Sequence, residues 1–86
     1  MTGRLSFLAA TAASDTGSAA KAASQAKTAQ KALDRHDADR AIVRAEAAVA
    51  LDPRNAAYRT LLGKAYLAAG RFPSAVAALT DALSLD

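Results

Sequence analysis

The residues of this chain best suited to chemistry gather around its single histidine, His36. A histidine that acts as a catalytic base needs an oriented partner and a nucleophile nearby. Asp34, Asp37 and Asp39 supply carboxylates, but their spacing fits neither a calcium loop nor a zinc site. We therefore predict that these side chains cap helices and solubilise the surface, with no catalytic and no metal-binding residue among them.

Other kinds of catalysis have no residues to support them. The sequence has no cysteine, which excludes disulfides, thiolate nucleophiles and cysteine-based zinc sites. It also lacks a glycine-rich phosphate loop, a nucleophile elbow and a paired-carboxylate arrangement. The tyrosines and phenylalanines are expected to fill gaps between helices, with Phe72 a wedge under a turn beside Pro73. The chain is thus predicted to be no enzyme and to need no cofactor.

The positive charge of the chain is concentrated in its first half. The net charge is +3, and residues 1–44 hold seven basic and four acidic side chains, whereas the remainder holds four of each. Lys21, Lys27 and Lys31 could form a basic stripe, but no aromatic residues are interleaved with them. A solvated helix face is the favoured interpretation. A module that binds nucleic acid or an anionic surface stays open as the alternative.

The first 18 residues are predicted to form a flexible leader. Arg4 precedes an uncharged run over residues 5–14, which is too short for a transmembrane helix of about 20 apolar residues. A disordered Ala/Ser/Thr-rich leader is the favoured interpretation, and a clipped secretory signal, which this run and the small residues Ala10 and Ala12 resemble, is the alternative. The compartment, cytoplasmic or periplasmic, therefore stays open.

The composition and the residues that start and end helices predict an all-α chain. Good helix formers are abundant and strand formers are scarce. Gly70 is suited to end a helix in the left-handed conformation, and Pro73 is suited to the first turn of the next. Asp37 and Asn55 are predicted N-caps, and Pro53 ends the helix before it. The predicted helices span residues 19–35, 38–51, 55–69 and 73–85.

The sequence repeats itself at an offset of 34 residues, which is how solenoid proteins are recognised. The two copies end in the patterns AxxxxxxAVxLD and AxxxxxxALxLD. The matched pairs are Ala41 with Ala75, Ile42 with Val76, Ala48 with Ala82, Val49 with Leu83, Leu51 with Leu85 and Asp52 with Asp86, with Leu33 and Leu67 further upstream.

The later copy, residues 56–86, resembles a tetratricopeptide repeat. The matching residues are Leu62, Gly63 and Tyr66 in the first helix, Gly70 in the turn, and Ala75, Leu79 and Ala82 in the second helix. Gly63 costs about 1 kcal/mol relative to alanine inside a helix, so we expect a close helix–helix approach at this position to compensate.

The earlier copy resembles a degenerate repeat. It keeps Ala41, Ala48, Leu51, Asp52 and the closing Pro53, and it has Thr28, Ala29, Ala32 and His36 where the later copy has Leu62, Gly63, Tyr66 and Gly70. Terminal repeats are commonly atypical, so a capping role is expected for it. The resemblance implies two stacked antiparallel helix hairpins, over residues 19–53 and 54–86.

The resemblance also implies a function, a non-catalytic scaffold that docks a protein or peptide segment on the concave face of its first helices. The implied contact positions are Gln30, Leu33 and Asp34 in the earlier copy and Thr60, Lys64, Leu67 and Ala68 in the later one. The clamp of Lys, Asn and Arg with which some family members hold a terminal carboxylate is not reproduced. Helices that merely link other parts of a longer protein are a third possibility.

Two repeats make a marginal stack, because about three are usually needed for stability. The outer face of the last helix is expected to be uncovered. We therefore expect either a fragment of a longer repeat protein or a chain that self-associates through that face.

Overall fold

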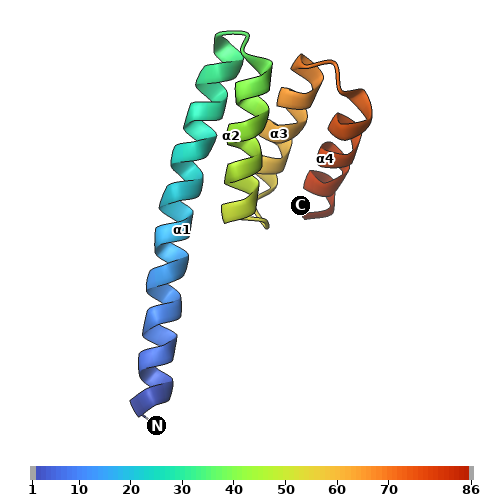
Figure 1. The fold of residues 1–86 in the computed structure, drawn as a ribbon. Helices are drawn as coiled ribbons and strands as arrows, with labels where there is room; N and C mark the ends of the chain where they lie inside the picture. Colours follow the sequence, from blue (N-terminus) through green and yellow to red (C-terminus); the bar gives the residue numbers. More distant parts are fainter. Residues whose placement is uncertain (1, 86) are drawn as a thin grey trace.

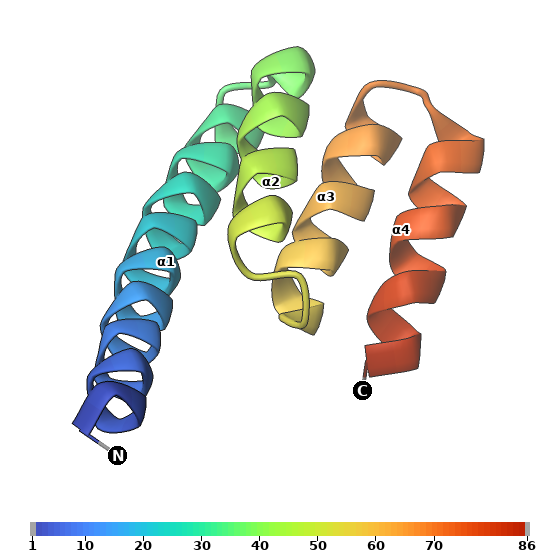
Figure 2. The same cartoon turned by 60° about the horizontal axis from the view of Figure 1, so that its bottom comes forward.

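The computed structural model of the chain describes the backbone of residues 2–85 and the side chains of residues 17–85. Four helices follow one another along the sequence: α1 (Thr2–Asp34), α2 (Ala38–Leu51), α3 (Ala56–Ala68) and α4 (Phe72–Leu85). Neighbouring helices run antiparallel and lie side by side, with α2 between α1 and α3 and with α4 on the far side of α3 (Figures 1 and 2). The predicted all-α class and its two stacked hairpins are confirmed.

Helix α1 is longer than the sequence predicted. It begins at Thr2 instead of near residue 19, and its first half extends beyond the other three helices (Figure 1). No proline stands in this segment to stop a helix, and a single internal glycine such as Gly17 costs only about 1 kcal/mol. The leader and signal-like run over residues 1–18 stay predictions, because Met1 and the side chains up to Thr16, with Ala10 and Ala12 among them, lie outside the described part.

No helix in the described part of the chain is long and apolar enough to cross a membrane.

The turn between α3 and α4 closes α3 with a glycine. The N–H of Arg71 donates to the carbonyl of Tyr66 at 2.9 Å, and the N–H of Gly70 donates to the carbonyl of Leu67 at 3.0 Å. Gly70 has a φ of 76°, in the left-handed region that glycine enters without steric cost. This pair of backbone hydrogen bonds around a left-handed residue is the Schellman motif, and the left-handed helix end predicted at Gly70 is confirmed.

The turn between α1 and α2 has the same geometry 34 residues earlier. The N–H of Asp37 donates to the carbonyl of Ala32 at 2.8 Å, and the N–H of His36 donates to that of Leu33 at 3.0 Å. His36 takes the left-handed position, with a φ of 62°. The degenerate copy therefore keeps the backbone of the turn although it lacks the glycine.

Side chains cap two of the helices as predicted. The carboxylate of Asp37 accepts a hydrogen bond from the N–H of Arg40 at 3.2 Å, and the amide oxygen of Asn55 accepts one from the N–H of Tyr58 at 3.2 Å. Each bond satisfies an N–H group that a helix start leaves without a partner inside the helix. Pro73 is the second residue of α4 and lies in its first turn, where its missing N–H costs nothing.

The core consists almost entirely of small side chains. Among the described residues its members are Ala22, Ala29, Ala32, Ala41, Ile42, Ala45, Ala48, Ala65, Ala75, Ala78 and Ala82. The expected close approach is present at Gly63, where an added β-carbon would lie 2.7 Å from Cγ and Cδ2 of Leu79. The helices can therefore pack closely because the side chains between them are small.

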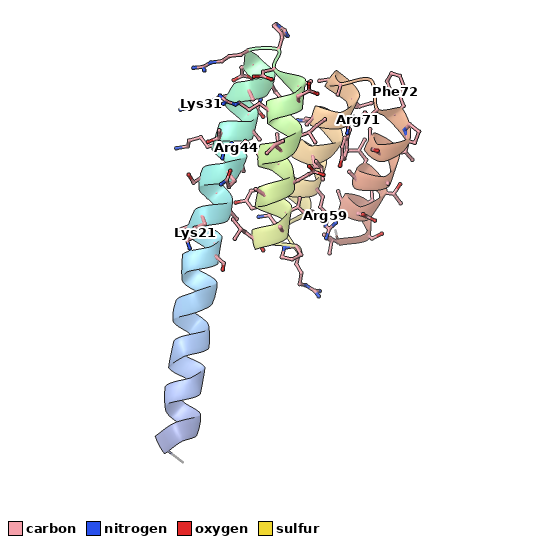
Figure 3. All side chains as sticks on the ribbon, viewed as in Figure 1. Lys21, Lys31, Arg44, Arg59, Arg71 and Phe72 are labelled. Carbon is pink, nitrogen blue, oxygen red and sulfur yellow. The ribbon has the colours of Figure 1, made fainter. Side chains whose placement is uncertain are left out.

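The prediction for Phe72 was wrong. Its side chain is 61% exposed and lies on the surface beside the α3–α4 turn instead of underneath it (Figure 3). Helix α4 begins at Phe72 itself, so the helical period sets the direction of this side chain. The same period places Val76 and Leu83 on that face of α4, and both are exposed too.

Candidate partner-binding groove

A groove of about 690 Å³ lies between α1 and α3. Its lining comes from the first helices of the two hairpins, which contact each other directly. The lining residues are Ala26, Lys27 and Gln30 of α1 and Ala57, Tyr58, Thr60, Leu61 and Lys64 of α3. The groove therefore lies between the two helices on which the resemblance implied partner contacts.

The structure brings three of the predicted contact residues together and leaves the others aside. Gln30, Thr60 and Lys64 line the groove. Asp34 is not part of the lining, but its carboxylate accepts a hydrogen bond of 3.0 Å from the side-chain amide of Gln30, one helical turn away. Leu67 is exposed outside the lining. Leu33 and Ala68 are also absent from the lining.

Sequence reasoning missed five lining residues, of which Lys27, Tyr58 and Leu61 have the largest side chains. A signal for them exists in the helical period. Residues 27 and 30 are three apart on α1, and residues 57, 58, 61 and 64 share one face of α3 at three-and-four spacing. The period alone does not say which side of α3 turns toward α1.

Two side-chain hydrogen bonds connect α2 to the groove-forming helices on either side of it. The guanidinium of Arg44 donates to the amide oxygen of Gln25 on α1 at 3.2 Å, and the hydroxyl of Tyr66 on α3 donates to the carboxylate of Glu46 at 3.0 Å. Figure 3 shows Arg44 between α1 and α2. Burial raises the pKa of Tyr66 above its ordinary value, and the hydrogen bond and negative charge of Glu46 raise it further. Tyr66 thus stays a neutral donor at physiological pH.

Arg59 fixes the start of α3 against the preceding turn and against α4. Its Nε donates to the carbonyl of Pro53 at 2.9 Å, and its guanidinium lies 3.6 Å from the carboxylate of Asp81. The ion pair is partly screened by water because Asp81 is mostly exposed. Together with the Asn55 cap, these contacts hold the end of α3 that carries Tyr58 and Thr60.

The groove combines an apolar lining with positive charge. Lys27 and Lys64 are its only charged lining residues, both are exposed, and no carboxylate lines it. The hydroxyl of Thr60 donates to the carbonyl of Ala56 at 3.1 Å, which leaves the oxygen free to accept. The lining offers apolar contact and two cations, with no nucleophile beside a base.

The residues around His36 form no such site. His36 is exposed in the α1–α2 turn, and Asp37 beside it caps α2. Over the side chains described, residues 17–85, no cluster of three or more His, Cys, Asp or Glu is placed to hold a metal ion.

The repeat signature residues occupy positions that fit their types. Ala41, Ala48, Gly63, Ala75 and Ala82 are buried in the stack, where their small size lets neighbouring helices approach. Leu62 and Tyr66 pack against the central cluster of Ala32, Ala41, Ile42 and Ala65. Gly70 makes the left-handed turn, and Pro53 follows α2 in the turn between the hairpins.

Comparison with known proteins agrees with this geometry. A family model described as Tetratricopeptide repeat matches residues 32–86, which include the end of α1 and all of α2, α3 and α4. No curated protein and no solved structure matches the chain. The chain belongs to the tetratricopeptide repeat family, whose repeats generally serve as protein–protein interaction modules and are typically non-catalytic.

Proposed function

We propose that the groove between α1 and α3 binds a segment of a partner protein in which apolar side chains stand beside at least one carboxylate. The observation that supports this most is the composition of the lining, where Lys27 and Lys64 are the only charges. A basic segment would be repelled by these two exposed cations, and a neutral segment would gain no ion pair from them.

The apolar part of the lining supplies the shape for such a segment. Tyr58 and Leu61 present the largest side chains, and the small Ala26 and Ala57 leave room between the helices. An apolar side chain seated there would gain free energy from burial, at about 25 cal/mol per Å². The lysines would then orient the segment by pairing with its carboxylates.

A random peptide display library selected on the intact chain tests this proposal. We expect the enriched peptides to combine Asp or Glu with Leu, Phe or another large apolar residue. The double variant Lys27→Ala/Lys64→Ala should bind a synthetic copy of the best peptide about 2- to 30-fold more weakly, because each exposed ion pair contributes about 0.2–1 kcal/mol.

Matched controls come from the same helices. Lys31→Ala removes an exposed lysine of α1 that does not line the groove, and Leu67→Ala removes an exposed apolar side chain just outside it. Both should leave peptide affinity unchanged. If Leu67→Ala weakens binding and the double lysine variant does not, the partner lies on the face that the family pattern implied and the assignment to this groove is wrong.

Nucleic acid or an anionic surface is the competing partner class. Lys21, Lys27 and Lys31 are all exposed, but Lys21 lies about 120° around α1 from Lys27, so the three do not form one stripe. An affinity of the chain for a single-stranded oligonucleotide that falls steeply with added salt would favour this class, because phosphate contacts release counterions.

Self-association through the last helix, the other partner expected from the sequence, concerns a different surface. This self-association stays a proposal, and it depends on the exposed apolar residues of α4.

A further inference from the structure

Helix α4 carries a row of four apolar side chains, of which three are mostly exposed and the fourth, Leu79, packs against Gly63 of α3. Phe72, Val76 and Leu83 are 61%, 63% and 76% exposed, and Leu79 between them is half-buried. The spacing of four, three and four residues places them on one face, which we call the α4 stripe. No charged residue stands between Phe72 and Thr80. A stripe of this kind is typical of a helix that packs against another helix.

The internal repeat shows what the same face does one hairpin earlier. Thirty-four residues before the stripe, α2 has Ala38, Ile42, Ala45 and Val49. Ile42 is only 5% exposed and belongs to the central cluster with Ala65 of α3, and Ala45 is fully buried. Ala38 and Val49 are half-buried, so the α4 stripe is the counterpart of a surface whose middle lies buried against an antiparallel helix.

A hollow beside the stripe supports this correspondence. It measures about 390 Å³ and is lined by Ala56, Ala57, Thr60, Leu79, Ala82 and Leu83. Three of the counterparts of these residues, Ala22, Ala45 and Ala48, are fully buried in the first hairpin. The hollow is thus shaped to receive side chains from a helix that covers α3 and α4 together.

The other described surfaces of the chain help to identify which surface of a second copy could cover the α4 stripe. Where α3 carries Leu61, Leu62 and Ala65, the equivalent positions of α1 are Lys27, Thr28 and Lys31. Helix α1 of another copy could therefore cover the stripe only by burying lysines, which is unfavourable without paired charges. Among the side chains described, residues 17–85, the exposed large apolar residues outside the stripe are Val43 on α2 and Leu67 on α3, which form no row, so the α4 stripe itself remains.

We propose that the α4 stripe is covered by the α4 stripe of a second copy of this chain, with the two helices antiparallel about a two-fold axis. A two-fold axis perpendicular to α4 makes the pair antiparallel, which is the relation of α3 to α2 within the chain. Phe72 of one copy then faces the end of α4 that carries Leu83 in the other. The same arrangement brings Arg71 close to the C-terminal end of the opposite α4, where the helix dipole favours a cation.

The contact is small, so the dimer should dissociate on dilution. Helix α4 has 14 residues and is about 21 Å long, and an interface along one such helix falls at the low end of specific interfaces. The assembly is closed, because an isologous contact uses the same patch in both copies. The hollow shares Ala57 and Thr60 with the proposed groove, so the two surfaces adjoin, but neither proposal depends on the other.

Sedimentation of the intact chain over about a hundredfold range of concentration tests the proposal. We expect a monomer–dimer equilibrium whose dissociation constant rises at least about tenfold in Val76→Asp/Leu83→Asp. Val43→Asp is the matched control, because Val43 of α2 is 61% exposed and lies outside the stripe; it should dimerise like the original chain. Circular dichroism should show equal helix content in all three.

Cysteine pairs test the direction of the two helices, since the chain has no cysteine of its own. Phe72→Cys and Leu83→Cys should each give little disulfide-linked dimer alone and a linked dimer when the two variants are mixed. Cross-linking of each variant with itself would indicate a parallel pair and overturn the proposal. A monomer at every concentration, a polymer of indefinite length, a dimer indifferent to Val76→Asp/Leu83→Asp, or a dimer equally disrupted by Val43→Asp would also overturn it.

Discussion

Replacing His36 with glycine is expected to stabilise the fold. His36 has a φ of 62° at the position where the later hairpin has Gly70 at 76°. A residue with a β-carbon in the left-handed region costs about 1–2 kcal/mol, which glycine avoids. Glycine in turn adds about 0.5–1 kcal/mol of conformational freedom to the unfolded chain. The difference between these two costs is about 0–1.5 kcal/mol, and from its middle we expect a net gain in the free energy of unfolding of about 0.5–1 kcal/mol.

Side-chain contacts contribute little to this comparison. His36 is exposed, and the hydrogen bonds of its turn are formed by backbone groups that glycine keeps. Gly70→Ala is the mirror experiment, because a β-carbon at Gly70 would meet no atom within 4 Å and only the backbone cost remains. It should lower the free energy of unfolding by about 0.5–1.5 kcal/mol.

Urea unfolding followed by circular dichroism measures both changes. A gain of about 0.5–1 kcal/mol in a domain of this size corresponds to a rise in Tm of about 2–8 °C. The slope of the transition should stay the same, since neither variant changes the buried surface. A His36→Gly variant that unfolds at lower urea than the original chain would refute the inference that the degenerate copy strains its backbone at this turn.

Three further changes probe the packing, the hydrogen bonds and the caps. Gly63→Ala should lower the free energy of unfolding in urea by about 1 kcal/mol, because overpacking against Leu79 outweighs the gain in helix propensity. In a double-mutant cycle with Leu79→Ala, this clash should appear as a coupling energy between the two positions. Tyr66→Phe should cost about 0.5–1 kcal/mol by removing the 3.0 Å bond to Glu46. The pKa of Tyr66 is raised in the folded state, so the stability that this hydrogen bond contributes is complete below the ordinary tyrosine pKa and is lost as pH rises through the raised value. The unfolding midpoints of the original chain and of Tyr66→Phe should therefore converge above about pH 10. Asn55→Ala should cost about 1 kcal/mol through the lost cap, and Asn55→Asp should restore most of it; equal midpoints for the two variants would contradict a capping role.

Local features of this fold could be predicted from the sequence because their causes are local. Gly70 ends α3 through its own φ, and Asp37 and Asn55 cap helices through hydrogen bonds to residues three positions ahead. The 34-residue offset added the long-range part, because it showed that both hairpins follow one pattern.

The lining of the groove could not be predicted in the same way. Whether Lys27 and Tyr58 face each other depends on the rotation of α1 against α3, which the packing of both helices on α2 determines. The core that sets this rotation is almost all alanine, so the sequence offers no contrast of large and small residues from which to read the buried face of α1. The family pattern placed Leu67 on the binding side, and here it lies just outside.

The difference between α2 and α4 also bears on what covers α4. At equivalent positions α2 has Ala38 and Ala45, which let α3 approach closely, whereas α4 has Phe72 and Leu79. A helix packed on α4 must therefore stay farther from its axis than α3 stays from α2, toward the upper part of the usual range of about 8–10 Å. When two α4 helices meet, large side chains from both helices fill the space at this wider separation. A helix with the small residues of the first hairpin would contribute no large side chains and would leave part of the hollow beside Leu79 unfilled.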